Sequence, residues 1–190
     1  MMLTGWHSRG YLPHLNAGQV PQMLTFRVAG SVPAGLLERL RQELRREAEV
    51  ERERLLRLSI ERHLDAGNGP LWLARTEIAA VIENAMLHFD GRRYSLLSWC
   101  IMPNHVHALA VPMHPHDLSD ILFSWKSFSA QRSNELLDRK GAFWDPDYFD
   151  RYIRDERHLA RAIEYIEMNP VKAGLCGRPE EWQWCSARRR

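Results

Sequence analysis

The segment that decides the fold reads WCIMPNHVHALAV over residues 99–111. At its centre two histidines, His105 and His107, flank a single apolar residue, Val106. On an extended strand residues i and i+2 point to the same face, so the two imidazoles project together, with their Cα atoms roughly 6–7 Å apart. Val106 then points to the opposite face, into a core. The segment therefore predicts a half-buried strand that carries a histidine pair on one side.

The histidine pair has two interpretations at this point. Neutral imidazole is the commonest metal ligand in proteins, so two histidines on one face supply half of a metal site. Alternatively, both are hydrogen-bonded histidines at the end of a half-buried strand. The strand by itself leaves both interpretations open.

The composition is that of an ordinary globular chain. It has 190 residues, 45% hydrophobic and 26% charged, with a formal net charge of +2. This length can bury a sizeable core, and we expect one domain over residues 1–190. The three cysteines, Cys100, Cys176 and Cys185, lack C-x-x-C spacing, which argues against a disulfide framework and a zinc ribbon. Because the N-terminus lacks an apolar signal region and no stretch reaches the length of a membrane span, we expect a cytoplasmic protein without membrane association.

The order of helical and strand patterns predicts an α+β fold with a small antiparallel sheet. We expect an irregular N-terminal arm over 1–21, strands over 22–29, 92–102, 105–111 and within 143–153, helices over 34–63, 76–90, 117–140 and 156–168, and a C-terminal tail over 176–190. The run 45–57 is almost all Glu and Arg. This run favours a solvated helix face with ion pairs over a nucleic-acid patch.

The last predicted helix carries residues that could complete a reaction site. Tyr165 and Asn169 are four positions apart, so they share one helical face. If that face packs over the histidine strand, Asn169 supplies an amide oxygen as a third metal ligand, and Tyr165 holds its hydroxyl over the metal. Tyrosine is a recognised covalent nucleophile, and a divalent ion with neutral ligands polarises a phosphodiester. The alternative is a tyrosine at the edge of the core and an ordinary asparagine before Pro170, which we expect to end the helix.

Together these motifs resemble those of the single-tyrosine HUH nucleases, and specifically those of the REP-associated tyrosine transposases. The similarity rests on MPNHVH at 102–107 and on YIEMNPVKAGL at 165–175. Supporting segments occur in the family's order at 9–14, 25–28, 124–128, 149–156 and 181–187. The resemblance implies a ferredoxin-like antiparallel sheet with helices packed on it and with the HUH motif on a central strand.

The resemblance also implies a function. It implies Mg²⁺ or Mn²⁺ held by His105, His107 and, by position, Asn169. It implies attack by Tyr165 on single-stranded DNA, which gives a 5′-phosphotyrosine and a free 3′-OH. Substrates in this family are hairpins from repetitive extragenic palindromes (REP), with a short guide sequence at the hairpin foot. The resemblance leans towards a monomer rather than a dimer.

Two residue assignments have competitors. Tyr152 is a rival nucleophile, and we favour Tyr165 because only it has an amide one helical turn away. The candidates for contacts with DNA phosphates are the basic residues Lys126, Arg132, Arg92, Arg93 and Lys172.

Two other functions are weighed against strand transfer. The first is a non-catalytic module of the same fold that binds hairpin DNA or RNA. Such a module has no physical reason to keep both histidines together with Tyr165 and Asn169. The second is a two-histidine, one-carboxylate iron site, which we disfavour because the strand offers no carboxylate beside the pair.

Overall fold

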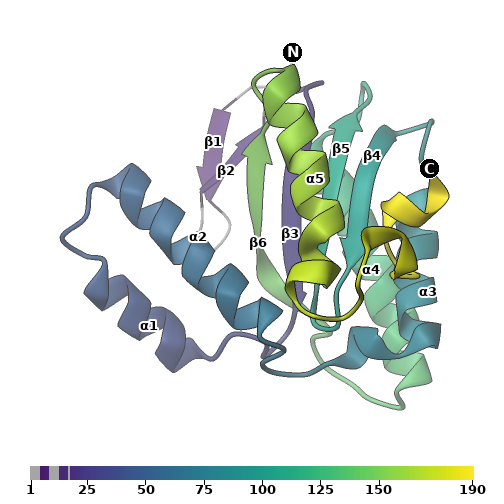
Figure 1. Cartoon of the computed structure of the whole chain (residues 1–190), viewed down its shortest axis with the longest axis horizontal. Helices are drawn as coiled ribbons and strands as arrows, with labels where there is room; N and C mark the ends of the chain where they lie inside the picture. The colour runs from purple at the N-terminus through teal and green to yellow at the C-terminus, as the bar shows by residue number, and fades with distance from the viewer. Residues whose placement is uncertain (1–4, 9–12, 17) are drawn as a thin grey trace.

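The computed structural model describes residues 5–8, 13–16 and 18–190 and shows a four-stranded antiparallel sheet. The strands of this sheet are β3 (Gln22–Val28), β4 (Tyr94–Ile101), β5 (His105–Pro112) and β6 (Trp144–Tyr152). Their order is β4-β5-β3-β6, so β5 pairs along both of its edges (Figure 1). The arrangement confirms the predicted α+β fold and the central position of the histidine strand.

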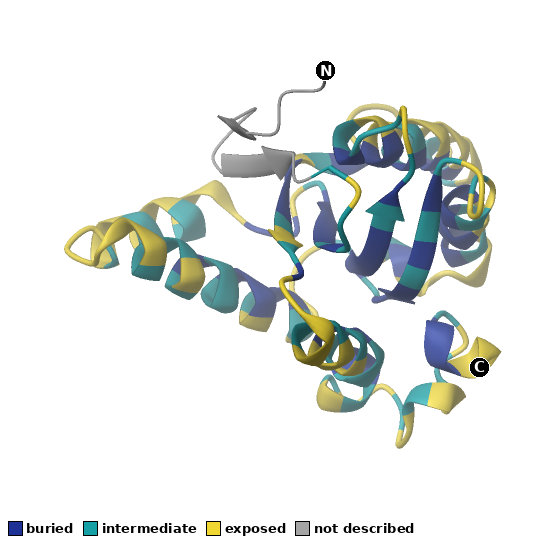
Figure 2. Cartoon of the chain, turned by 90° about the horizontal axis from the view of Figure 1, so that it is seen from above, coloured by how far each residue is buried: buried dark blue, intermediate teal, exposed yellow. Residues whose placement is uncertain are grey.

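Helices cover both faces of the sheet and give three layers (Figures 1 and 2). On one face lie α3 (Thr76–Leu87) and α4 (Leu118–Leu136); on the other lies α5 (Glu156–Lys172) with the C-terminal segment. Val106 packs in the main core with α3 and α4, whereas Leu109 packs in a smaller cluster under α5. The alternation along β5 therefore sends alternate residues to opposite faces, as the sequence predicts.

The prediction of one continuous helix over 34–63 was wrong, because two helices form there. These are α1 (Ala34–Glu43) and α2 (Glu49–Asp65), which fold back as a hairpin that projects from the sheet (Figures 1 and 2). The turn lets leucines of α1 pack against buried apolar residues of α2 in one cluster. Full burial of one such side chain contributes about 1.5–3 kcal/mol, and the partly buried leucines of α1 contribute less. The outer surface carries ion pairs such as Arg54 with Glu51, at 2.6 Å, which agrees with a solvated face.

The prediction that the last helix ends at residue 168, before Asn169 and Pro170, was also wrong, because α5 continues through Pro170 to Lys172. A proline this close to the end of a helix removes only one backbone hydrogen bond. The helix then closes normally, with the Ala173 N–H donating to the Asn169 carbonyl at 2.9 Å. Asn169 therefore keeps helical geometry, one turn after Tyr165.

The other helix bounds differ from prediction by a few residues. The Asp117 side chain caps α4 by accepting the Asp120 N–H at 2.9 Å. The helix ends at Leu136 rather than near residue 140, because Asp138 adopts φ 46°, the left-handed conformation that terminates helices. α3 ends at Leu87, three residues before its predicted bound.

The two ends of the chain contain more regular structure than the sequence suggests. The predicted irregular arm contains β1 (Gly5–Ser8) and β2 (Pro13–Asn16), which pair antiparallel, so the prediction was wrong for these residues. Residues 1–4, 9–12 and 17 of the arm lie outside the described residues. The tail packs on β4, where the Trp182 indole N–H donates to the Ile101 carbonyl at 3.0 Å. The short 3-10 helices are η1 (Trp72–Ala74), η2 (Pro179–Glu181) and η3 (Ser186–Arg189). In the part of the chain that the structure describes, no helix is long and apolar enough to cross a membrane.

Candidate active site

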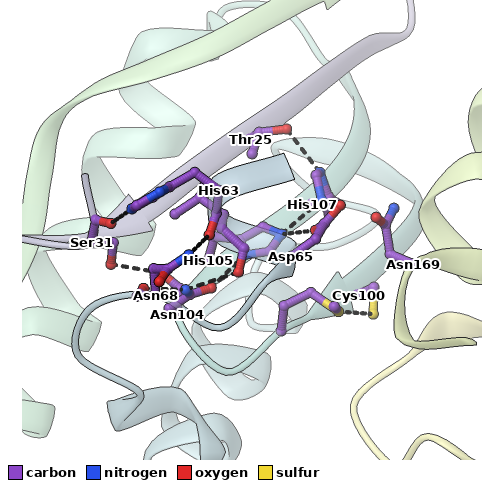
Figure 3. Close-up of polar contacts among 12 residues, drawn as sticks. Thr25, Ser31, His63, Asp65, Asn68, Cys100, Asn104, His105, His107 and Asn169 are labelled. Atoms are coloured by element: carbon purple, nitrogen blue, oxygen red, sulfur yellow. Dashed lines mark hydrogen bonds and ion pairs between the residues drawn. The ribbon is translucent and has the colours of Figure 1, made fainter. Parts of the chain in front are cut away.

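β5 brings the two histidine rings together at a fully buried position. His105 and His107 are 1% and 0% exposed. Their Nε2 atoms lie 3.0 Å apart, and the rings are nearly perpendicular, at 88°. Figure 3 shows the two rings converging on a common space. The structure therefore joins the two imidazoles as their i, i+2 spacing predicts.

Asn104 and Thr25 fix the orientation of the two rings. The Asn104 Oδ1 atom lies 2.7 Å from His105 Nδ1, and the Thr25 hydroxyl lies 2.8 Å from His107 Nδ1 (Figure 3). Because an amide oxygen only accepts hydrogen bonds, His105 must carry its proton on Nδ1 and keep a lone pair on Nε2. The Thr25 hydroxyl can accept from His107 Nδ1 in the same way, which directs both Nε2 lone pairs to the shared space.

Burial keeps both imidazoles neutral. It lowers the pKa of His105 well below its usual range, and the adjacent His107 adds to this shift. Burial, followed by the positive charge of Lys172, lowers the pKa of His107 to about 3. Both rings are therefore neutral at pH 7, which is the form that binds metal ions.

The end of α2 places a carboxylate beside the histidine pair, and the sequence analysis missed it. Asp65 Oδ1 lies 3.5 Å from His105 Nε2. The ligand atoms of Asp65, His105 and His107 all lie within 4.8 Å of one another. The strand itself offers no carboxylate, but disfavouring a two-histidine, one-carboxylate set on that ground was wrong, because α2 supplies Asp65. Burial raises the pKa of Asp65 to about 6, while Lys172 opposes this shift.

The loop after α2 is tied to β5 through Asn104. The Asn104 Nδ2 group donates to the Leu64 carbonyl at 3.1 Å and to the Asn68 carbonyl at 2.8 Å. Gly69 has φ +83°, and a Cβ there would lie 2.6 Å from a backbone carbon of the chain before α1. Only glycine fits such a position. The run DAGNG at 65–69, which reads as a simple chain break, is thus a tight loop that holds Asp65 against the histidines. The acidic first residue of this run was the available sequence signal.

α5 places Asn169 next to the histidines. Asn169 is buried, and its Nδ2 group donates to the Tyr165 carbonyl at 2.7 Å. Its Oδ1 atom has no hydrogen-bond partner among the described residues. In Figure 3 Asn169 lies beside His107 with its oxygen on the histidine side. A buried acceptor without a donor costs about 1–3 kcal/mol, so this oxygen is a free ligand atom at a site where binding a cation would remove that cost.

Tyr165 contacts the histidine pair directly. Its ring packs edge-on against His107, with centroids 5.6 Å apart, and Lys172 Nζ lies 4.8 Å from the ring centroid. Burial, and then the negative charges of Glu61 and Asp65, raise the pKa of Tyr165.

The rival tyrosine lies elsewhere. Tyr152 is at the end of β6, where the Arg154 guanidinium lies 5.5 Å from its ring centroid. Of the two candidate nucleophiles, Tyr165 is therefore the one with a ring contact to the histidine pair.

The donor set fits a divalent cation. Two imidazole nitrogens that bind one ion at about 2.1 Å and at right angles are about 3.0 Å apart. That is the separation of the two Nε2 atoms, whose lone pairs would otherwise repel each other. Asp65 Oδ1 and Asn169 Oδ1 both lack hydrogen-bond partners within the described part of the chain. These orphaned oxygens and the two lone-pair nitrogens form a group that could hold a metal ion.

The five basic residues predicted to contact phosphate are not gathered at this site. Lys126 donates to backbone carbonyls at the start of β6, and Arg132 pairs with a glutamate on its own helix. Arg92 and Arg93 lie over an aromatic ring in the turn between α3 and β4. Of the five, Lys172 contacts the site tyrosine. The predicted roles of the other four stay predictions.

Comparisons with known proteins point in one direction. The profile of the family described as "Transposase IS200 like" matches residues 74–169. A REP-associated tyrosine transposase of Escherichia coli K12 is 23% identical over 99 residues, which cover 52% of this chain and 57% of that protein. A Haemophilus influenzae protein provisionally named a REP-associated tyrosine transposase is 26% identical over 106 residues, which cover 50% of this chain and 60% of that protein. The chain spans about 60% of the length of these curated relatives.

A solved structure shares the fold. It is described as a REP-associated tyrosine transposase bound to a REP hairpin, and it matches with a TM-score of 0.59 and 16% identity, covering 96% of this chain and 83% of that one. The family-matched segment includes the histidine pair, Tyr165 and Asn169, whereas Asp65 lies before it.

Proposed function

Because this chain belongs to the IS200-like transposase family, we propose that it cuts and rejoins single-stranded DNA through a covalent bond to Tyr165. One observation carries the proposal. Two buried, neutral imidazoles converge with a carboxylate, and the ring of the tyrosine packs edge-on against one of these imidazoles. A site of this kind combines a nucleophile with a place for a cation, which is what attack on a phosphodiester requires.

The metal ligands in this proposal are His105, His107 and Asp65, with Asn169 as a further oxygen donor. Carboxylate and amide oxygens suit Mg²⁺ and Mn²⁺, and imidazole suits a broader range of ions. The bound ion would act as a Lewis acid that draws electron density from the phosphorus. Asn104 and Thr25 hold the imidazoles in the tautomers that this role needs.

The chain's own residues carry the remaining chemistry. The Tyr165 oxygen attacks the phosphorus, an O–P bond forms, and the bond from phosphorus to the 3′ oxygen breaks. The phenol loses its proton and the departing 3′ oxygen gains one, so the products are a 5′-phosphotyrosine and a free 3′-OH. Lys172, beside the Tyr165 ring, supplies positive charge where the phosphate gains negative charge. Attack by a 3′-OH on the phosphotyrosine reverses the step and joins strands without ATP.

The substrate we propose is single-stranded DNA with a REP-type hairpin. Support comes from the two curated relatives named as REP-associated transposases and from the fold shared with a protein solved on a REP hairpin. The active form we propose is a monomer, since the buried site draws its ligands from one chain.

The test uses an end-labelled single-stranded hairpin with its flanks, incubated with Mn²⁺ or Mg²⁺ and run on a denaturing gel. We expect a slow-migrating covalent adduct with the wild type and with Tyr152→Phe, and no adduct with Tyr165→Phe. Tyr165→Phe should still bind the hairpin in a native gel, because it lacks only a hydroxyl. Adduct formation by Tyr165→Phe would refute the assignment of the nucleophile. Tight hairpin binding by the wild type with no adduct under either metal would instead support a non-catalytic binding module.

A further inference from the structure

α2 carries a charged row on the face that it turns towards the site. Arg57, Glu61 and Asp65 follow one another at intervals of four residues, so they line one side of the helix. Tyr165 and Asn169 line the side of α5 that faces the histidines in the same way. Asp65 at the end of the charged row belongs to the metal group, which leaves Glu61 without a role in the proposed function.

Glu61 is buried in a manner that requires an explanation. It is 8% exposed and lies in α2 between the buried apolar residues Ile60 and Leu64. Its ion-pair partner Arg57 is distant, with Nε 3.8 Å from Glu61 Oε1. Arg57 Nε itself has no hydrogen-bond partner among the residues that the structure describes. Burying a carboxylate costs several kcal/mol unless hydrogen bonds and close charges compensate, and one loose ion pair compensates only weakly.

Besides Arg57, the Glu61 carboxylate interacts with the positive charge of Arg151 and with the candidate nucleophile. The Glu61 carboxylate lies within hydrogen-bonding reach of the Tyr165 side chain. The tyrosine is thus held at two points, with its ring edge-on against His107 and its hydroxyl at Glu61. Two contacts of this kind restrict both torsions of the side chain, and so they fix the position of the attacking oxygen relative to the histidines.

We propose that Glu61 is a positioning residue for Tyr165, whose carboxylate accepts the hydrogen bond of the tyrosine hydroxyl and holds the attacking oxygen over the histidine pair. The inference rests on the proposed function of Tyr165. It makes α2, which lies before the family-matched segment, part of the reaction site at both Glu61 and Asp65.

Positioning of this kind has a measurable consequence for rate. A reacting atom displaced by about 1 Å costs on the order of 100-fold in rate. Replacing Glu61 by alanine removes the acceptor, whereas replacing it by glutamine keeps an acceptor oxygen at nearly the same reach. The rate should therefore follow the presence of the acceptor, while DNA affinity, which depends on other surfaces, should not change.

The first experiment measures single-turnover adduct formation at saturating hairpin DNA. We expect Glu61→Ala to be about 10- to 100-fold slower than the wild type, with an unchanged Kd for the hairpin. Glu61→Gln should recover to within about threefold of the wild type, because its amide oxygen still accepts. Glu53→Ala and Glu53→Gln are matched controls on the same helix, since Glu53 interacts with Glu49 and Arg52 and not with the site.

The second experiment detects the environment of Tyr165 directly and does not depend on catalytic activity. Protein labelled with 3-fluorotyrosine gives a ¹⁹F NMR resonance for each of its five tyrosines, and Tyr165→Phe identifies the one from Tyr165. We expect this resonance to shift in Glu61→Ala, to return towards the wild-type position in Glu61→Gln and to stay in place in both Glu53 variants. Dispersed resonances from the other tyrosines show that each variant is folded.

The outcomes separate the two hypotheses. An unmoved Tyr165 resonance in Glu61→Ala, an unchanged rate in Glu61→Ala, or a Glu61→Gln variant as slow as Glu61→Ala each overturns the positioning role. If the wild type forms no adduct, the proposed function fails, and the ¹⁹F comparison still decides whether Glu61 holds Tyr165.

Discussion

The site has two halves that differ in how firmly their side chains are held. In the half built by β5 and β3, each imidazole is buried and fixed through its Nδ1 atom by Asn104 or Thr25. In the half built by α2, Asp65 is only partly buried and its Oδ1 atom lacks a hydrogen-bond partner within the described residues. We expect the first half to be preformed, and we expect the Asp65 side chain, whose backbone the loop fixes, to adjust when a ligand binds. Mutations in the two halves should therefore differ in the kind of effect as well as in its size.

The largest effect is expected in the preformed half. His105→Ala removes one of two converging nitrogen ligands and leaves the Asn104 oxygen without its donor. We expect adduct formation to fall below detection at every Mg²⁺ or Mn²⁺ concentration, while hairpin binding persists. The measurement is the denaturing gel across a metal titration. Full activity of this variant would remove the metal site from the proposed mechanism.

A mutation in the half built by α2 should weaken metal binding without abolishing it. Asp65→Asn keeps the size of the side chain but removes the negative charge that faces His105. Ion affinity depends strongly on the number of charged ligands, so we expect the Mn²⁺ concentration for half-maximal activity to rise about 100-fold. Activity should return at saturating metal, which is the sharpest contrast with His105→Ala. If Asp65→Asn is as inactive as His105→Ala at high metal, the two halves are equally essential and the contrast fails.

The two halves of the site also differ in how well their residues could be predicted from the sequence. The i, i+2 spacing of the histidines and the i, i+4 spacing of Tyr165 and Asn169 are local periodicities, and the structure places each pair on one face. Asp65 and Glu61 reach the site only because the helix breaks after Glu43 and α2 folds back beside the sheet. The sequence periodicity of α2 does not predict which part of the sheet the helix packs against, so these contacts depend on tertiary packing.

Asn104 contacts both halves of the site, so its replacement should change both the stability of the fold and the affinity for metal. Asn104→Ala leaves the His105 Nδ1 proton and the carbonyls of Leu64 and Asn68 without a partner. Unpaired buried polar groups cost about 1–3 kcal/mol each, so we expect the free energy of unfolding to fall by about 2–4 kcal/mol. Loss of a residue that orients a ligand should also weaken Mn²⁺ binding about tenfold. Urea unfolding and the metal titration measure the two effects, and a change in metal affinity with unchanged stability would show that the loop does not depend on this amide.

We expect the smallest change in activity from removing a positive charge at the edge of the site. Lys172 is exposed and lies against Tyr165, whereas the amine of Lys126 is committed to the carbonyls of Asp145 and Pro146. We expect Lys172→Gln to slow adduct formation several-fold and to reduce the slope of log K against log salt by about 0.7, the value for one phosphate contact on single-stranded DNA. Lys126→Gln should leave that slope unchanged and lower the free energy of unfolding instead, because it removes hydrogen bonds between α4 and β6. The reverse result, with a salt slope that depends on Lys126 and not on Lys172, would place the DNA on the α4 face of the sheet, away from the histidine pair.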